Sequence, residues 1–198
     1  CHKGIPKQVK IGLFGGSFNP IHNAHVKLAS TICKEAGLDE VWFLVTPHNP
    51  LKQQEELMDE KDRLAMVRLA LEKEPNLKAS DYEFHLERPS YTWNTIQHLS
   101  EDYPENEFYI IIGGDNWQIF HHWAHHEEIL RDYHIIVYPR KDSTIDTTSL
   151  PHSVSIVRMP EMDISSTMIR QLLRNGKDIS PYVCPKVAQY LRNNAKNR

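Results

Sequence analysis

The segment Gly12-Leu-Phe-Gly-Gly-Ser-Phe-Asn-Pro-Ile-His-Asn-Ala-His25 decides how the rest of the chain is interpreted. Before it, Val9–Ile11 begins a short apolar, β-branched run that is typical of a buried strand. After it, apolar side chains recur at helical spacing, at Val26, Leu28, Ala29, Ile32 and Cys33. We therefore predict a strand, a turn containing Gly15, Gly16, Ser17 and Phe18, and a helix. Glycines let the backbone approach a ligand closely, and the N-terminus of a helix favours an anion such as phosphate.

Two histidines, His22 and His25, stand at the start of the predicted helix. Positions i and i+3 share one helix face, so both imidazoles can reach a group held at the helix N-terminus. There they can donate hydrogen bonds to a phosphoryl oxygen as negative charge builds on it. A single histidine here would be read as a cap or a solvated residue, but the pair after Gly-Gly-Ser indicates a site.

The composition narrows the class of protein. The chain has 198 residues and a net charge of −3, from 26 acidic and 23 basic groups, which gives no basic footprint for nucleic acid. The three cysteines are widely spaced and odd in number, which argues for a reducing compartment. No apolar run approaches the roughly 20 residues of a membrane span. We expect a cytoplasmic protein that binds neither nucleic acid nor membrane.

The next segments predict a βαβ unit and hence a parallel sheet, because residues 40–46 form a second apolar, β-rich run. Lys52 follows this strand in a proline-containing loop, so it is either a ligand of a substrate phosphate or a solvated lysine. Residues 59–72 read as an amphipathic helix, and residues 77–86 as a further strand.

Two later strands end in side chains suited to a nucleotide. Residues 108–112 are an unbroken apolar run leading to Asp115. Its carboxylate can accept hydrogen bonds from ribose hydroxyls, cap the following helix, or do both. Residues 134–138 are followed by Arg140, which can pair with a phosphate. A short strand at 154–157 is expected to be the last.

A second motif, Ile164-Ser-Ser-Thr-Met-Ile-Arg170, begins a helix near the end of the chain. Ser165 or Ser166 suits the N-cap, and Thr167 and Arg170 lie within one turn of it. Taken alone, the motif fits a plain capped helix as well as an anion site. Its pairing with the His22/His25 segment favours the anion site.

Two aromatic segments remain. Ser90-Tyr-Thr-Trp-Asn-Thr95 opens a helix and could be ordinary capping. Trp123 could stack on a planar ring, most strongly on a cationic pyridinium. Its neighbours form two i, i+4 histidine pairs, His121/His125 and His122/His126, whose spacing occurs in some zinc sites. No third ligand is evident, so a polar helix is favoured over a metal site.

These motifs resemble the HxGH nucleotidyltransferases, and more narrowly the bacterial nicotinate-nucleotide adenylyltransferases, from Lys10 to about Tyr190. The chain departs from the family pattern at Asn19 and Asn94, where the family usually has Asp, and at Ala24, where it has Gly. The resemblance implies a Rossmann-like doubly wound α/β sheet, mostly parallel, with strand order 3-2-1-4-5 and a C-terminal helical segment. With no repeats or linkers, we expect a single nucleotidyltransferase domain over residues 1–198.

The resemblance also implies an activity, adenylyl transfer from ATP to nicotinate mononucleotide in NAD synthesis, with Mg²⁺ carried in by ATP and no separate metal site. It makes His22, His25 and Arg170 the catalytic residues. ATP would be bound by Gly15, Gly16, Ser17, Phe18, His22, His25, Asp115, Ser165, Thr167 and Arg170. Nicotinate mononucleotide would be bound by Ser17, Lys52, Tyr91, Thr92, Trp123 and Arg140.

Several alternatives stay open at this point. The acceptor could be nicotinamide mononucleotide, because the acid and the amide are poorly distinguished by sequence. Phosphopantetheine is disfavoured, because the enzymes that use it typically carry Thr in place of His22 and lack the Ser-x-Thr-x-x-Arg ending. A nucleotide-sensing protein would be expected to lose His25 or Arg170. A homo-oligomer is possible.

Overall fold

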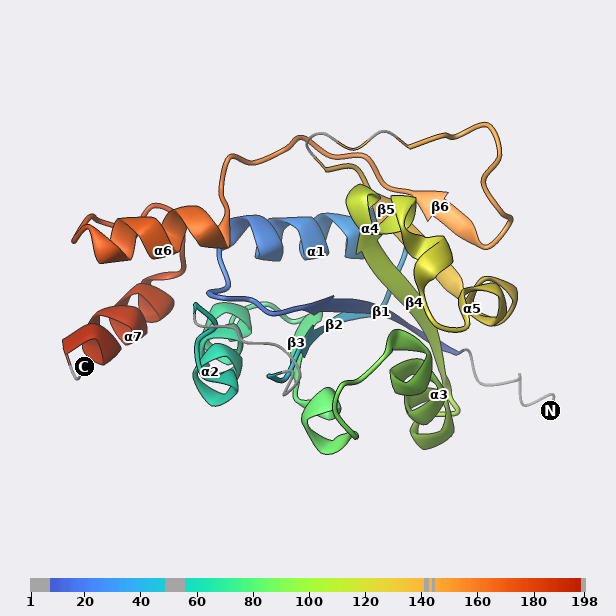
Figure 1. The fold of residues 1–198 in the computed structure, drawn as a ribbon, viewed down its shortest axis with the longest axis horizontal. Coiled ribbons are helices and arrows are strands. Elements are labelled where there is room, and N and C mark those ends of the chain that lie inside the picture. The colour runs from blue at the N-terminus through green and yellow to red at the C-terminus, as the bar shows by residue number, and fades with distance from the viewer. Residues whose placement is uncertain (1–7, 49–55, 141–142, 144, 197–198) are drawn as a thin grey trace, which may run out of the picture.

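The computed structural model describes residues 8–48, 56–140, 143 and 145–196. Its centre is a six-stranded sheet in the spatial order β3-β2-β1-β4-β5-β6, and every neighbouring pair is parallel (Figure 1). The strands are β1 (Val9–Gly16), β2 (Glu40–Val45), β3 (Leu77–Ser80), β4 (Asn106–Gly113), β5 (His134–Tyr138) and β6 (Val154–Ile156). The predicted Rossmann-like order 3-2-1-4-5 is confirmed, and β6 extends it beside β5.

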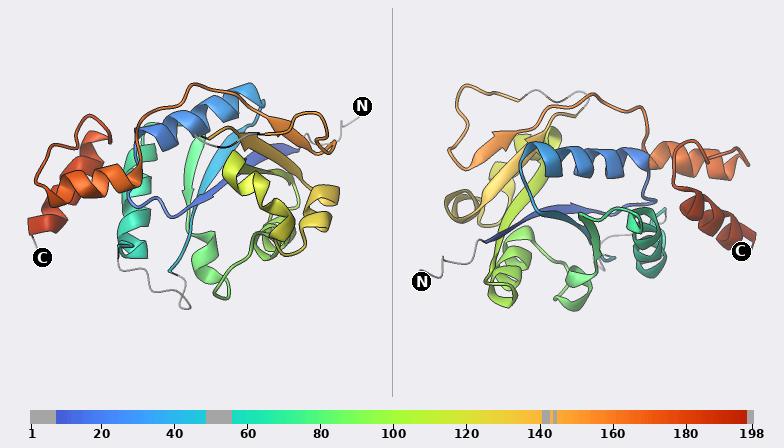
Figure 2. Two further views of the ribbon diagram at one scale, coloured as in Figure 1. Left: turned by 45° about the horizontal axis from the view of Figure 1, so that its top comes forward. Right: turned by 180° about the vertical axis from the view of Figure 1, so that it is seen from behind.

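Helices cover both faces of the sheet (Figures 1 and 2). The α-helices are α1 (Asn23–Glu35), α2 (Glu60–Leu71), α3 (Thr92–Asp102), α4 (Gly114–Gln118), α5 (His126–Asp132), α6 (Ser166–Arg174) and α7 (Pro185–Lys196). Side chains of α1, α2, α6 and α7 join one buried cluster, and those of α3 and α5 join the other. Because both faces are buried, the central strands read as continuous apolar runs. None of the described helices has the length and hydropathy needed to cross a membrane.

Alternation along β1 sends Leu13 to one cluster and Phe14 to the other. In register, Gly16 of β1 lies beside Val45 of β2, and Phe14 lies beside Ile111 of β4. The carboxyl ends of these three strands therefore meet at one edge of the sheet. In open α/β sheets ligands bind at this edge.

Two sequence-based predictions of local structure need correction. Only Leu77–Ser80 of the predicted strand 77–86 is extended, and Tyr82–His85 forms a 3₁₀ turn, η1. The histidines around Trp123 do not share one helix. Phe120–His122 is a 3₁₀ turn, η2, and α5 begins only at His126, after His125 adopts a left-handed conformation with φ 56°. The i, i+4 argument for a metal site therefore fails.

A fully buried arginine, Arg63 of α2, forms hydrogen bonds to three separate segments near the edge where β1 and β2 end. Its Nε donates to the carbonyl of Met58 at 2.9 Å, and its Nη1 donates to those of Ser17 at 2.8 Å and Thr46 at 2.7 Å. Burial lowers the pKa of its guanidinium, and the negative charges of Glu60 and Asp59 act in the opposite direction. Sequence analysis missed Arg63, because it reads as one more charge on an amphipathic helix.

We expect Arg63→Met to lower the free energy of unfolding by on the order of 3 kcal/mol, because three buried carbonyls would lose their donor. Arg68→Met is the matched control, an exposed arginine on the same helix, and should cost less than about 0.5 kcal/mol. Urea denaturation of both variants checks this. Equal midpoints for the two would contradict it.

Candidate active site

The turn between β1 and α1 is held in an unusual backbone conformation. Phe18 has φ 48°, a left-handed value that a non-glycine residue adopts only when its surroundings enforce it. Its buried ring packs edge-on against Phe14, with centroids 5.5 Å apart, and against His25, at 5.1 Å. The aromatic core thus fixes the turn and one face of a predicted catalytic histidine together.

The predicted pair His22 and His25 is brought together at the N-terminus of α1. His22 is the N-cap residue, and its ring stacks on that of His25 with centroids 3.7 Å apart. The backbone N–H of His22 donates to Nδ1 of His25 at 3.2 Å. Since Nδ1 of His25 accepts, the proton of the neutral ring lies on Nε2, where it can be donated to an anion.

Both imidazoles are neutral at physiological pH. Burial, with a smaller contribution from the positive charge of Arg140, lowers the pKa of His22 to about 4. Burial is the main cause that lowers the pKa of His25 well below its ordinary value, and electrostatic interactions with His22 and Arg140 lower it further. Nδ1 of His22 is buried and has no hydrogen-bond partner within the described residues. A buried polar atom without a partner at such a place is suited to a ligand.

The second sequence motif docks directly onto this turn, although some 150 residues separate the two. The hydroxyl of Ser166 donates to the carbonyl of Pro20 at 2.9 Å, and Nη1 of Arg170 donates to that of Asn19 at 2.7 Å. Ser165 is the N-cap of α6, and its Oγ accepts from the N–H of Met168. The N-termini of α1 and α6 therefore converge, as phosphate binding by both would require.

Besides its hydrogen bond to Asn19, the Arg170 guanidinium makes contacts that a ligand could replace. Its Nη2 donates to Oγ1 of Thr167 at 3.3 Å and lies 3.7 Å from a carboxylate oxygen of Glu56. Its Nε is buried without a partner among the described residues. Ion pairing to an exposed carboxylate such as Glu56 is weak, so an incoming phosphate can replace it.

Asn19, one of the departures from the family pattern, has a structural role. Its Nδ2 donates to the carbonyl of Glu56 at 3.0 Å, and its Oδ1 accepts from the N–H of Met58 at 3.0 Å. An aspartate could accept the second hydrogen bond, but it could not donate the first. The amide thus suits the path of the chain at residues 56–58.

Asp115 and Arg140 lie together at the ends of β4 and β5. Nε of Arg140 is 3.9 Å from Oδ1 of Asp115, and both side chains are more than half exposed. Gly113 lies between them, and a Cβ there would come within 2.5 Å of Cδ of Arg140, so a larger residue would displace this side chain. The positive charge of Arg140 lowers the pKa of His22 and of His25, which shows that Arg140 lies near both imidazoles.

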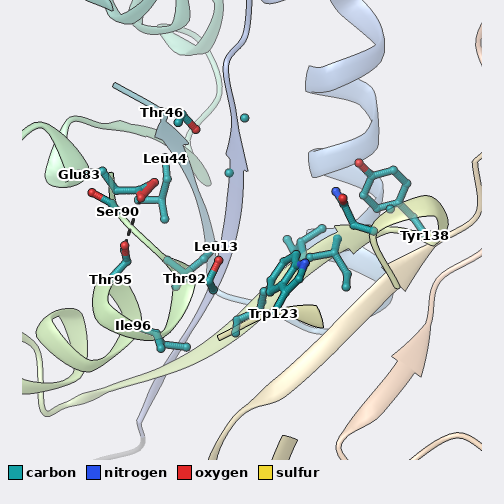
Figure 3. Close-up of a pocket in the computed structure, with 17 residues that line it drawn as sticks. Leu13, Leu44, Thr46, Glu83, Ser90, Thr92, Thr95, Ile96, Trp123 and Tyr138 are labelled. Carbon is teal, nitrogen blue, oxygen red and sulfur yellow. Dashed lines mark hydrogen bonds between the residues drawn. The ribbon is translucent and has the colours of Figure 1, made fainter. Parts of the chain in front are cut away.

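A pocket opens beside this group, at the carboxyl ends of β1, β2 and β4 (Figure 3). The predicted residues Gly15, Gly16, Thr92 and Trp123 line it. Trp123 packs against Phe120 with ring centroids 5.0 Å apart and lines the pocket together with Thr92 and Glu83 (Figure 3). The pocket lining combines apolar side chains such as Leu13, Leu44 and Ile112 with polar ones such as Ser90 and Asn116, as a site for a planar ring with a polar substituent would require.

Other predicted residues are not brought into this pocket. Tyr91 is the N-cap residue of α3 and is 56% exposed, whereas its neighbours Ser90 and Thr92 line the pocket. Lys52 lies outside the described residues. Within the described part of the chain, no three His, Cys, Asp or Glu side chains gather as a metal site would require.

Sequence analysis missed several residues of the pocket. Thr46, Asn116 and Tyr138 follow or end strands β2, β4 and β5, a position that could have identified them. Thr95 ends the Ser90–Thr95 segment singled out in the sequence, although no role was assigned to it. Glu83 gave no signal, because it fell within a predicted strand.

The comparison with protein families matches residues 13–172 to the cytidylyltransferase-like family. A relative from Bacteroides fragilis, named as a probable nicotinate-nucleotide adenylyltransferase, is 49% identical over 180 residues, covering 91% of this chain and 90% of its own. The nicotinate-nucleotide adenylyltransferase of Bacillus subtilis is 35% identical over 185 residues, covering 93% of this chain and 96% of its own.

A solved structure supports the fold independently. The nicotinic acid mononucleotide adenylyltransferase of Plasmodium falciparum, complexed with NaAD, superposes with a TM-score of 0.78. The match covers 93% of this chain and 95% of the other at 23% identity, so it bears on the fold alone. The family match and the sequence relatives go further, and this chain belongs to the nicotinate-nucleotide adenylyltransferases within the cytidylyltransferase-like family.

Proposed function

We propose that the protein transfers the adenylyl group of ATP to nicotinate mononucleotide, giving nicotinate adenine dinucleotide and pyrophosphate. One observation carries the proposal. His25 from α1 and Arg170 from α6 converge on the Gly15–Pro20 turn, beside a pocket lined by Trp123. Because both ends of the chain supply the site, we also propose that residues 1–198 act as one domain.

The ATP side of the site would use the two converging helix N-termini. Nε2 of His25 would donate to an oxygen of the α-phosphate, where negative charge builds in the transition state. His22, through its unpartnered ring nitrogen, would donate to a neighbouring phosphate oxygen. Arg170, with Ser165 and Thr167, would hold the β- and γ-phosphates, and Asp115 would hold the ribose. Gly15, Gly16, Ser17 and Phe18 would form the turn that the nucleotide approaches.

The acceptor side would use the pocket. Trp123 would stack on the pyridinium ring, and Thr92 would face its carboxylate. The exposed Tyr91, the residue before Thr92, would have to turn toward the ligand to contact it. Arg140, Lys52 and Ser17 would hold the acceptor phosphate. The acceptor and the α-phosphate would then meet over the turn, between the imidazoles and Arg140.

The chemistry would need no covalent intermediate. An oxygen of the acceptor phosphate attacks the α-phosphorus in line, a new P–O bond forms, and the bond to pyrophosphate breaks with its electron pair leaving on the β-phosphate oxygen. Neutral imidazole donors stabilise the charge without adding a fixed positive charge, and positioning supplies the remainder. Mg²⁺ would enter as part of the substrate, bound to the ATP triphosphate.

The proposal is tested by pyrophosphate release from Mg·ATP with nicotinate mononucleotide, nicotinamide mononucleotide and phosphopantetheine offered separately. We expect rapid release with the first and slow release with the second. Comparable rates with the first two would keep the chemistry and contradict the preference for the acid. ATP binding without release from any acceptor would indicate a nucleotide sensor.

His25→Ala should lower kcat about 100- to 1000-fold, because a preorganised transition-state donor is lost. The Kd for ATP should change much less, since the donor acts mainly on the transition state. His98→Ala, which removes an exposed histidine on α3, is the control and should leave both unchanged. A parallel loss of kcat and ATP affinity in His25→Ala would argue against this role.

The neutral histidines also predict a pH profile. At saturating acceptor, kcat/KM for ATP should stay constant between about pH 6.5 and 8.5, because both imidazoles have already lost their second proton. The activity should fall only as pH drops toward the lowered pKa of His22, about 4. A tenfold loss per unit above about pH 6.5 would instead mean that an imidazolium is required.

A further inference from the structure

A buried carboxyl group lines the acceptor pocket, and the roles assigned above leave it unused. Glu83 lies in η1, is 9% exposed, and lines the pocket together with Ser90 and Thr92 (Figure 3). It is the one acidic side chain among the described residues that line the pocket. An ionised carboxylate here would repel the anionic ring substituent that the pocket is proposed to bind, so the presence of Glu83 has to be explained.

Hydrogen bonding distinguishes the two oxygens of this carboxyl group. Oγ1 of Thr95, a buried hydroxyl on α3, lies 3.1 Å from Oε2 of Glu83 (Figure 3) and 3.3 Å from the carbonyl oxygen of Tyr91, so its single proton is shared between these two acceptors. Within the described part of the chain, Oε1 has no hydrogen-bond partner. When the hydroxyl donates to Oε2, a proton on the carboxyl group sits on Oε1.

Glu83 changes between its neutral and its ionised form near neutral pH. Burial raises its pKa to about 7, and the hydrogen bond from Thr95 acts in the opposite direction. The charged groups around it are engaged elsewhere. On its own turn, Tyr82 and His85 contact Asp102 and Asp81, and Arg88 of the following segment forms two 2.7 Å hydrogen bonds with Glu60 of α2.

The elements packed against η1 add no compensating charge. From α3, Thr92 and Thr95 face the pocket, and from β2 and its end, Leu44 and Thr46 do so. Across the pocket, Tyr138 is the remaining titratable group, and burial raises its pKa above the ordinary value. Glu83 is therefore the group of this pocket wall that changes charge near neutral pH.

We propose that Glu83 determines whether the pocket takes the acid or the amide of the pyridine. The protonated carboxyl group donates from Oε1 to the nicotinate carboxylate. The ionised group repels that carboxylate and accepts from the amide N–H of nicotinamide. This inference rests on the proposed function and names the residue that sets its acceptor preference.

The test compares kcat/KM for nicotinate mononucleotide with kcat/KM for nicotinamide mononucleotide across about pH 6 to 8.5. The ratio removes titrations that both acceptors share, including the acceptor phosphate, ATP and the histidines. In the unmodified protein, the ratio should fall at least about tenfold over this range, because the acid-binding form is lost tenfold per pH unit above its pKa.

Glu83→Gln mimics the protonated form, with its carbonyl toward Thr95 and its amide N–H toward the pocket. It should show a ratio that does not change with pH and that equals the low-pH value of the unmodified protein. Glu87→Gln, the same change at an exposed position four residues later, should keep the original slope. Thermal unfolding identifies any variant that fails to fold.

Thr95→Val provides a second variant. Because the hydrogen bond from Thr95 lowers the pKa of Glu83, removing it should move the midpoint of the ratio to higher pH. A flat ratio in an active unmodified protein, or an unchanged slope in Glu83→Gln, would overturn the inference. Absence of pyrophosphate release with either acceptor would instead reject the proposed function.

Discussion

The structure depends on how the carbonyl groups of one tight turn are satisfied. Between β1 and α1 the chain turns at the carboxyl edge of the sheet, and side chains from distant segments donate to two of its carbonyls. Arg63 donates to the carbonyl of Ser17 from beneath, and Arg170 donates to that of Asn19 from the side. A guanidinium can serve several acceptors at once from a rigid frame. These hydrogen bonds fix the turn that leads into His22 and His25 at the start of α1.

The same arrangement sets the charge of the site. The rings of Phe18 and His22 enclose His25, and this desolvation keeps both imidazoles neutral, aided by the positive charge of Arg140. The site therefore combines neutral imidazoles, one of them with its tautomer set by the N–H of His22, with the cationic side chains of Arg140 and Arg170. In the adjoining pocket, desolvation acts on an acid instead and holds Glu83 in its protonated form up to about pH 7. Burial thus tunes a base and an acid in opposite directions.

Much of this organisation could be predicted from the sequence. The alternation of strand and helix patterns over residues 9–46 predicted a parallel sheet, and the apolar runs at 108–112 and 134–138 predicted two further strands. The two motifs at residues 12–25 and 164–170 identified His22, His25 and Arg170, because helix N-termini with these side chains favour phosphate. The predictions failed where periodicity was weak. Residues 81–86 turned rather than extended, and the histidines around Trp123 were split by the left-handed residue His125.

What the sequence by itself determined is therefore local: which segments form strands and helices, and which helix ends suit phosphate. The tertiary structure alone decided which distant groups meet, including Arg63 with Ser17, Arg170 with Asn19, and Glu83 with Thr95 in the pocket beside Trp123. It also decided protonation, because the pKa of His22 or Glu83 follows from the burial of each side chain, and burial depends on packing between elements far apart in the chain. Spacing along the chain carries the periodicity of an element, whereas desolvation and long-range hydrogen bonds exist only once the elements are packed.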